Sequence, residues 1–139
     1  MGKKKETPWE TEALTLGSFA KPNYTTTFTY NANAGTLYIK SNANRQYHCI
    51  QKSWTFVNGY EYKLEYDITY VSGTHMGGAR KSNNSMFADS GYVRESKHII
   101  IEFQYNSDLA YITLFDTVST AETGEMTYSN FSLQRRLIA

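Results

Sequence analysis

The segment Tyr60–Val71 alternates between two kinds of side chain at successive positions. Its even-numbered residues are aromatic or aliphatic: Tyr62, Leu64, Tyr66, Ile68 and Tyr70. The intervening residues are charged or polar: Glu61, Lys63, Glu65, Asp67 and Thr69. Because successive side chains of a strand point to opposite faces, this pattern predicts a long strand with one buried and one solvated face.

Shorter segments carry the same alternation, and they predict further strands. These segments are Thr25–Tyr30, Leu37–Lys40, Ser53–Val57, His98–Tyr105, Tyr111–Phe115 and Met126–Leu133. The turn signal Asn58–Gly59 is expected to join Ser53–Val57 to Tyr60–Val71 as a hairpin. Many short strands without a convincing internal helix predict an all-β fold, an antiparallel β-sandwich or barrel.

Composition and charge exclude several classes of protein. The 139 residues suit one domain, and a 15% aromatic share with only 2 Pro favours half-buried strands. With 14 Lys and Arg against 13 Asp and Glu, the chain lacks the basic excess expected of a nucleic-acid binder. The single Cys49 excludes an internal disulfide. No apolar run is long enough for a membrane span, and no export signal is recognised at the N-terminus.

Residues 1–23 are more charged and less regular than the rest, so we expect an N-terminal arm followed by a domain over residues 24–139. Thr7 suits a helix cap and Glu10 stands where a capping box needs its carboxylate. These signals predict a short helix over residues 8–15, with a disordered tail as the alternative. The candidate partner-docking residues in the arm are Trp9, Lys3, Lys4 and Lys5.

The connection over residues 72–97 is longer than compact domains commonly have between strands. Long loops of this kind are often functional, so His75, Arg80 and Tyr92 are candidate ligand contacts. The alternative is a solvated loop that contains one short strand near Tyr92–Val93.

Further candidates for ligand contact are Tyr38, Tyr111 and Phe115, which fall on the face opposite the apolar positions of their strands. An exposed aromatic ring on a sheet can stack on a sugar ring or pack against a partner subunit. The alternative is a cross-strand pair that merely covers the sheet. We therefore expect these residues to bind a ligand, without deciding between saccharide and protein.

We expect no enzyme activity, no catalytic residue and no metal site. Glu61, Glu65 and Asp67 lie on the polar face of one strand, which is typical of a solvated sheet face rather than of the facing carboxylates of a glycosidase. His48 and Cys49 are neighbours in a strand and point to opposite faces, so they do not form a nucleophile and base. The three histidines fall in different elements, without metal-ligand spacing.

Three stretches taken in chain order carry a resemblance to a known family. They are Gly35–Ile39, Trp54–Tyr66 with the turn Asn58–Gly59, and Tyr128–Leu133. Together they resemble the carbohydrate-binding modules with a galactose-binding-like jelly-roll fold. In those modules a Phe-x-Val strand, a glycine turn and a Tyr-x-Leu-x-Phe strand are followed by a last strand with an Asp-Asn-Val-x-Leu pattern. The resemblance implies a jelly-roll sandwich over roughly residues 33 to 134.

The chain also departs from this family. Ser129 replaces the acid of the last-strand pattern, although Asn130 remains, so the structural calcium ion that the family suggests lacks support and we expect no cofactor. The first strand of the family, with its conspicuous Trp, is absent, and the arm stands in its place.

Two functions are left open. Similar jelly rolls occur as free-standing proteins of bacteriophage particles. A single module with an arm and no signal then favours a virion component, synthesised in the cytoplasm, that decorates a capsid and serves adhesion. Its partners would be capsid subunits held by residues 1–23, with glycans as ligands and homo-oligomer formation left open. The alternative is a soluble carbohydrate-binding module or lectin unrelated to a virus particle.

Overall fold

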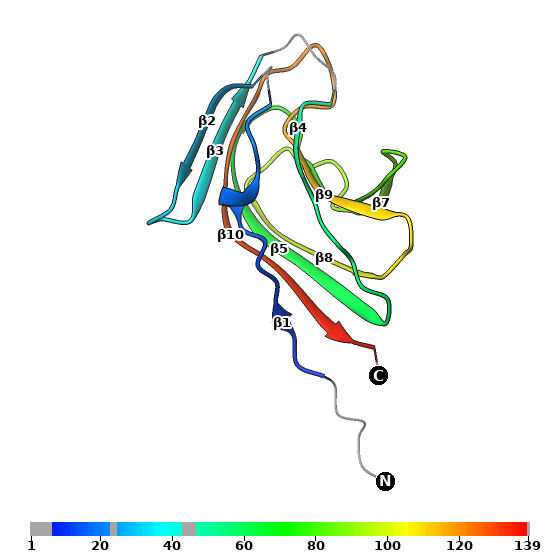
Figure 1. Ribbon diagram of the computed structural model, residues 1–139. Helices are drawn as coiled ribbons and strands as arrows, with labels where there is room; N and C mark the ends of the chain where they lie inside the picture. The colour runs from blue at the N-terminus through cyan, green and yellow to red at the C-terminus, as the bar shows by residue number, and fades with distance from the viewer. Residues whose placement is uncertain (1–6, 23–24, 43–46, 139) are drawn as a thin grey trace.

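The computed structural model describes residues 7–22, 25–42 and 47–138, which form two antiparallel β-sheets packed face to face (Figure 1). The sheet we call the β5 sheet has the strand order β2 (Thr25–Asn31), β3 (Thr36–Ser41), β10 (Gly124–Leu137), β5 (Tyr60–Ser72) and β8 (Lys97–Gln104). The sheet we call the β9 sheet has the order β4 (Cys49–Ser53), β9 (Leu109–Phe115), β6 (Met76–Lys81) and β7 (Met86–Asp89). The predicted antiparallel β-sandwich is confirmed. In the described residues no helix is long and apolar enough to cross a membrane.

The alternation predicted for Tyr60–Val71 is confirmed in β5. Four of its apolar side chains are fully buried between the sheets: Tyr62, Leu64, Tyr66 and Ile68. Leu64 lies opposite Leu133 of β10 on one side and Ile101 of β8 on the other. From the facing sheet, β9 contributes Ile112 and Leu114. Burying side chains of this size stabilises a fold by about 1.5–3 kcal/mol each, so this strand is the centre of the core.

The hairpin expected at Asn58–Gly59 is wrong. β4 ends at Ser53 and pairs with β9, whereas β5 pairs with β10 and β8 in the other sheet. The turn therefore completes a crossing between the sheets, with Gly59 at a positive φ of 89°. The Asn58–Gly59 signal correctly predicts a turn at this position, although not the hairpin. Val57, however, donates its amide to the Tyr62 hydroxyl and not to a backbone ladder.

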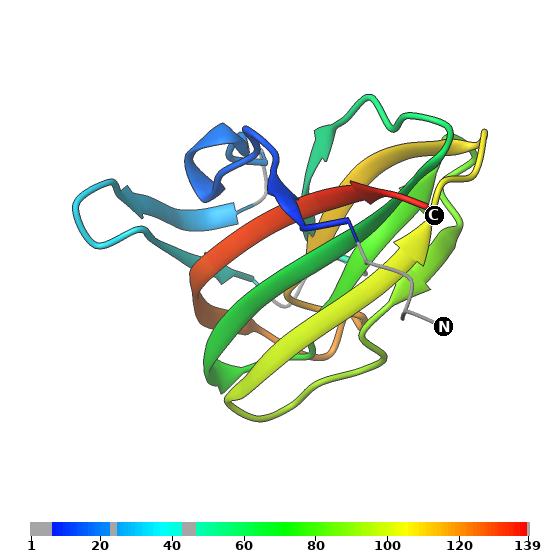
Figure 2. The same ribbon diagram turned by 90° about the horizontal axis from the view of Figure 1, so that it is seen from below.

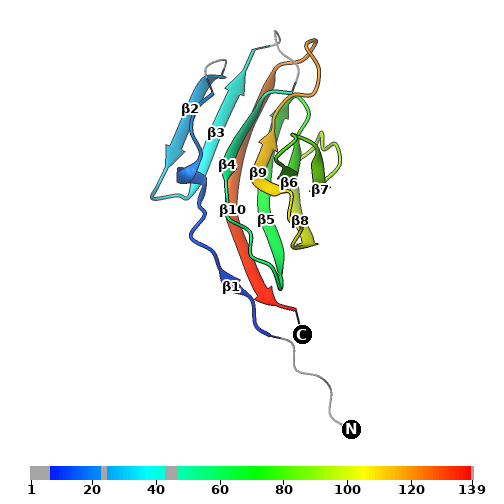
Figure 3. The ribbon, with the colours of Figure 1, turned by 45° about the vertical axis from the view of Figure 1, so that its right-hand side comes forward.

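The single long loop expected over residues 72–97 is also wrong, since it contains both β6 and β7. Figure 3 shows them beside β9 and β4 in one sheet. β6 escaped recognition because Gly77 and Gly78 carry no side chain to alternate. Their smallness is required: a Cβ on Gly77 would stand 2.1 Å from the Tyr66 hydroxyl, and one on Gly78 would stand 1.9 Å from the Ala88 carbonyl.

The helix expected over residues 8–15 is not formed. Residues 7–22 instead contain the short strand β1 (Glu10–Thr11), which pairs with the C-terminal end of β10, and the 3-10 helix η1 (Leu16–Ser18) (Figure 2). A helix of barely two turns has little stability of its own, and tertiary contacts decide the conformation. Three apolar side chains of the segment are buried in the core: Leu14, Leu16 and Phe19. Residues 7–22 are thus part of the sandwich and not a separate arm.

Candidate functional site

The outer face of the β9 sheet carries a set of side chains that the strand register brings together. Cys49 of β4 and Met76 of β6 both lie opposite Phe115 of β9, and Arg80 of β6 lies opposite Tyr111. Residues opposite one another in an antiparallel sheet share a face. These side chains therefore lie on one face, away from the core residues Ile112 and Leu114.

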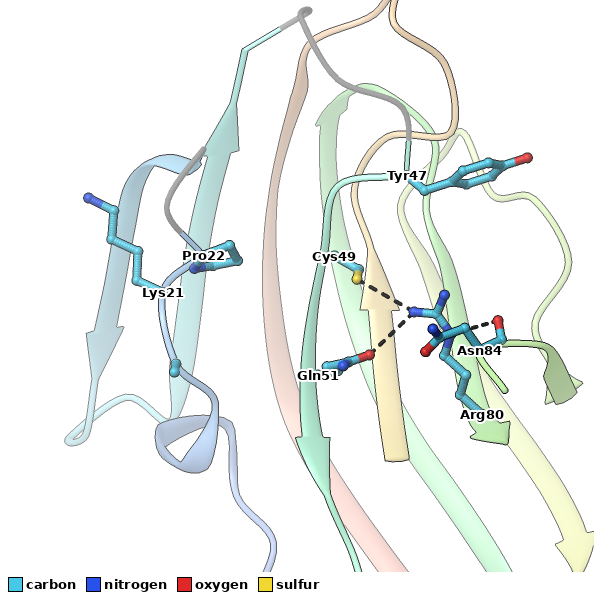
Figure 4. Close-up of a pocket in the computed structure, with 8 residues that line it drawn as sticks. Lys21, Pro22, Tyr47, Cys49, Gln51, Arg80 and Asn84 are labelled. Carbon is cyan, nitrogen blue, oxygen red and sulfur yellow. Dashed lines mark hydrogen bonds between the residues drawn. The ribbon is translucent and has the colours of Figure 1, made fainter. Parts of the chain in front are cut away.

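Two neighbouring pockets open on this face. The first has a volume of about 460 Å³ and lies between Lys21 and Pro22 on one side and Arg80 and Asn84 on the other (Figure 4). The second, about 250 Å³, shares Tyr47, Arg80 and Asn84 with the first. Together we call them the Arg80 groove, defined by Ala20, Lys21, Pro22, Tyr47, Cys49, Gln51, Met76, Arg80, Asn84, Met86, Tyr92 and Phe115.

Neutral groups hold the Arg80 guanidinium at the centre of the groove. Its Nε donates a hydrogen bond to the Asn84 carbonyl (2.9 Å), and its Nη1 donates to Gln51 Oε1 (3.3 Å), as Figure 4 shows. The Cys49 sulfur lies 3.9 Å from the same Nη1. Beneath it, the Phe115 ring centroid is 5.3 Å from the guanidinium carbon, a cation–π arrangement. Among the described residues no carboxylate forms an ion pair with Arg80.

Two exposed tyrosines flank this guanidinium. Tyr47 is 45% exposed, and its ring packs edge-on against the ring of Phe115 at a centroid distance of 5.9 Å. Tyr92 is 56% exposed, with the Arg94 guanidinium 5.8 Å from its ring. Tyr47 also adopts a positive φ of 57°, which is strained for a residue with a side chain. Such rings offer a large flat surface at low entropic cost.

The setting of the Cys49 thiol disfavours the thiolate form that a nucleophile needs. Burial raises its pKa, and the nearby Arg80 guanidinium only partly opposes that shift. A thiol with a raised pKa is protonated near neutral pH and reacts poorly. The groove therefore supplies hydrogen bonds, a positive charge and aromatic surface.

Arg80, Tyr92 and Phe115 are the predicted site residues that the fold brings together in the groove. Tyr111 shares the sheet face and lies opposite Arg80 in register, but it lines neither pocket. Phe115 is 3% exposed, so the prediction of an exposed ring is wrong. Tyr47 and Arg80 cover it, and its role is to support them.

The two other predicted ligand contacts lie elsewhere. His75 is completely buried between the sheets, where Tyr66 and the Phe115 carbonyl occupy its two ring nitrogens, so its assignment as a ligand contact is wrong. Tyr38 lies on the outer face of the β5 sheet and donates its hydroxyl to Glu125 Oε2 (2.8 Å). It is on the opposite side of the sandwich from the groove.

Sequence reasoning missed several groove residues: Lys21, Tyr47, Gln51 and Asn84. Tyr47 precedes β4 outside any alternating segment. Asn84 stands in the turn between β6 and β7, two strands that the pattern did not reveal. The only sequence signal for β6 is Arg80 directly after Gly77, Gly78 and Ala79, because it is the first large side chain after a run of small residues.

The predicted docking residue Trp9 contacts its own domain. Its ring centroid lies 4.1 Å from the Arg136 guanidinium and 4.9 Å from the Lys63 ammonium. The other three predicted docking residues, Lys3, Lys4 and Lys5, lie outside the described residues.

The residues that the family resemblance would assign to calcium do not fit the ion. Asn130 donates its side-chain amide to Asp67 Oδ2 (2.7 Å) and adopts a positive φ of 51°. Ser129 supplies no carboxylate. Across the described ranges no group of three His, Cys, Asp or Glu residues is arranged to hold a metal ion.

No protein-family model and no curated protein matches the chain. Solved structures do. The CBM1 module of BiXyn10A is 18% identical with a TM-score of 0.56, covering 94% of this chain and 98% of that one. CBM29-2, in a variant complexed with cellulohexaose, is 11% identical with a TM-score of 0.57, covering 94% and 93%. A CBM4 structure is 13% identical with a TM-score of 0.54, covering 76% and 87%.

At these identities the likeness establishes the fold. The chain has the antiparallel β-sandwich jelly roll of carbohydrate-binding modules, as the resemblance implied.

Proposed function

We propose that this protein is a carbohydrate-binding module or lectin that binds a glycan in the Arg80 groove and does not cleave it. The observation that carries the proposal is the pairing of exposed Tyr47 and Tyr92 with the polar groups of Gln51, Arg80 and Asn84 in one groove. The jelly-roll likeness supports it, since one of the similar structures is described as a complex with cellulohexaose.

Saccharide recognition needs both kinds of group at once. The flat faces of a pyranose ring are largely C–H and pack against aromatic rings, whereas the rim of hydroxyls needs hydrogen-bond partners. In the groove the tyrosine rings are positioned for the first contact. Gln51, Arg80 and the Asn84 side chain are positioned for the second.

We expect binding without hydrolysis because the described residues that line the groove include no acid. Most glycosidases use two carboxylates that face each other across the scissile bond. No Asp or Glu lines either pocket among the described residues. The expected absence of enzyme activity is kept as part of this proposal.

A glycan array followed by isothermal titration calorimetry on the best oligosaccharide tests the proposal. Tyr47→Ala and Tyr92→Ala should each weaken binding by about tenfold, because each removes a stacking surface. Tyr38→Ala is the matched control, since Tyr38 lies on the other sheet, and it should leave binding unchanged. An array without any bound glycan, or equal losses in all three variants, would overturn the proposal.

The virion role, with its capsid partners and homo-oligomer, stays a prediction with less support. Residues 1–23 were expected to dock onto a capsid subunit, but the described part of this segment packs Leu14, Leu16 and Phe19 into the core of its own domain. The similar structures described above are carbohydrate-binding modules. Both facts favour the lectin alternative.

A further inference from the structure

We propose that the Arg80 groove selects an acidic saccharide, specifically a glycan that contains uronic acid. This inference rests on the proposed function, because it names the ligand class of the same site. It is carried by the placement of an arginine without an acidic partner between aromatic surfaces.

The charges that line the groove all have one sign. Lys21 and Arg80 are the charged residues among those that line the two pockets. Beside the groove, the Lys81 ammonium lies over the Phe87 ring (5.6 Å) and Arg94 over the Tyr92 ring. These cations thus contact aromatic rings where a surface cation commonly contacts a carboxylate.

An acidic residue does occur on this sheet, but it is engaged elsewhere. Asp89 of the edge strand β7 accepts a hydrogen bond from the Gly91 amide (2.7 Å) and lines neither pocket. Asp116, the neighbour of Phe115, is completely buried, and burial raises its pKa to about 6. Neither of these two residues forms an ion pair with Arg80.

The opposite face of the sandwich has the reverse arrangement. Acidic side chains gather on the outer face of the β5 sheet, where their partners are close: Glu61 with Arg136, Glu125 with Lys40, and Glu65 and Asp67 with His98. The formal net charge of +1 is therefore unevenly distributed over the described residues, with ion-paired acids on one face and unpaired cations in the groove on the other. Four acidic side chains are thus paired on one face, while no described residue that lines the groove on the other face is acidic.

The geometry at Arg80 suits a carboxylate in particular. Nε and Nη1 are held by Asn84 and Gln51, which fixes the plane of the guanidinium. Nη2 has no hydrogen bond within the described part of the chain, so one edge of the fork can donate to a ligand. A planar guanidinium pairs well with a planar carboxylate, and such bonds are stronger than neutral ones.

One sugar residue can satisfy both parts of the site. In a hexuronate the carboxylate is attached directly to the pyranose ring. Tyr47 and Arg80 line both pockets, so a ring stacked on Tyr47 brings its substituents within the same groove as the guanidinium. A neutral sugar makes the same stacking contact, but its hydroxyls accept from the guanidinium only as neutral groups, without the charge-assisted bond.

The experiment compares oligogalacturonate with its carboxyl-reduced, neutral counterpart by calorimetry on the full chain. We expect the acidic form to bind at least tenfold more tightly, because a charge-assisted hydrogen bond replaces a neutral one. Its affinity should fall with added salt, while that of the neutral form should not. Arg80→Gln should abolish the preference, and Arg80→Lys should keep only part of it, since lysine lacks the fork.

Lys97→Gln is the control, because it removes one positive charge from β8 in the other sheet. It should leave the preference intact, and circular dichroism of each variant checks that the fold is retained. Equal affinity for both forms would overturn the acidic preference and leave the proposed glycan binding standing. Binding of neither form, with no hit among neutral or acidic glycans on the array, would overturn both.

Discussion

The Tyr66 hydroxyl and His75 Nε2 lie 2.6 Å apart in the centre of the sandwich, and both side chains are fully buried. His75 Nδ1 lies 2.8 Å from the Phe115 carbonyl, which only accepts, so Nδ1 carries the proton and Nε2 accepts from Tyr66. This chain of bonds joins β5 to β9 beneath the Arg80 groove. The core thereby positions Phe115, on which the guanidinium rests.

Tyr66→Phe should destabilise the fold by about 1–3 kcal/mol, because it leaves the buried His75 Nε2 without a donor. Urea unfolding followed by fluorescence measures the change. Tyr30→Phe is the control, since Tyr30 is 40% exposed, and its loss should be close to zero. Similar stabilities for parent and Tyr66→Phe would show that the buried bond contributes nothing.

Gly77→Ala should destabilise the fold by about 1–3 kcal/mol, because the new methyl group would stand 2.1 Å from the Tyr66 hydroxyl. The same substitution in a Tyr66→Phe background should cost less, since the crowding oxygen is gone. A double-mutant cycle by urea unfolding measures this coupling, which we expect to exceed about 0.5 kcal/mol. Strict additivity would contradict the predicted contact.

Leu14→Ala should cost about 2–5 kcal/mol, the usual range for a buried leucine. This result would distinguish a segment that belongs to the core from an arm that serves only for docking. Val71→Ala, at a position that is 60% exposed, is the control and should change little. A truncation of residues 1–23 would remove three core side chains, so loss of assembly in that variant would not identify a docking arm.

Two buried groups should give stability a pH dependence with opposite signs. Burial lowers the pKa of His75 from 6.5 to about 3, so the unfolded chain takes up a proton first and stability falls as the pH drops below 6.5. Burial raises the pKa of Asp116 from 3.8 to about 6, so the folded chain takes up a proton first and stability rises as the pH drops from 6 to 3.8. Each contribution changes by at most about 1.4 kcal/mol per pH unit.

Asp116→Asn separates the two contributions. At pH 8 the variant should be more stable than the parent, because it no longer buries a charged carboxylate, and the advantage should shrink towards pH 4. Between pH 6 and 4 its stability should fall more steeply than that of the parent, since His75 is then unopposed. Urea unfolding at several pH values measures both trends. A pH-independent difference between the two proteins would contradict the raised pKa.

His98 should titrate above its ordinary pKa. On the outer face of the β5 sheet, its Nδ1 bonds to Asp67 and its Nε2 to Glu65 (2.7 Å), and these bonds raise its pKa. Its contribution to stability is complete below 6.5 and is lost as the pH rises through the raised value. NMR titration of the ring should show the shift, and Asp67→Asn should reduce it. An unchanged titration in that variant would contradict the pairing.

The strand pattern around β5 could be predicted from the sequence because alternation reports burial directly. Residues such as Leu64 and Glu65 have opposite preferences for water, and a strand is the conformation that separates them at every step. The β-sandwich follows, since the apolar face needs a covering layer. The candidate site was predicted in part, through Arg80 and Tyr92.

By itself the sequence determined that segments such as Tyr60–Val71 are strands with one solvated face, and hence the class of fold. Only the tertiary structure decided which strands pair, that β6 exists, and that Leu14 and Phe19 are buried. It also decided that His75 lies in the core while Tyr47 joins Arg80 in a groove. The physical reason is that alternation is a local property of the chain. Pairing, close approach at glycine and the gathering of distant side chains depend on contacts between residues far apart in sequence.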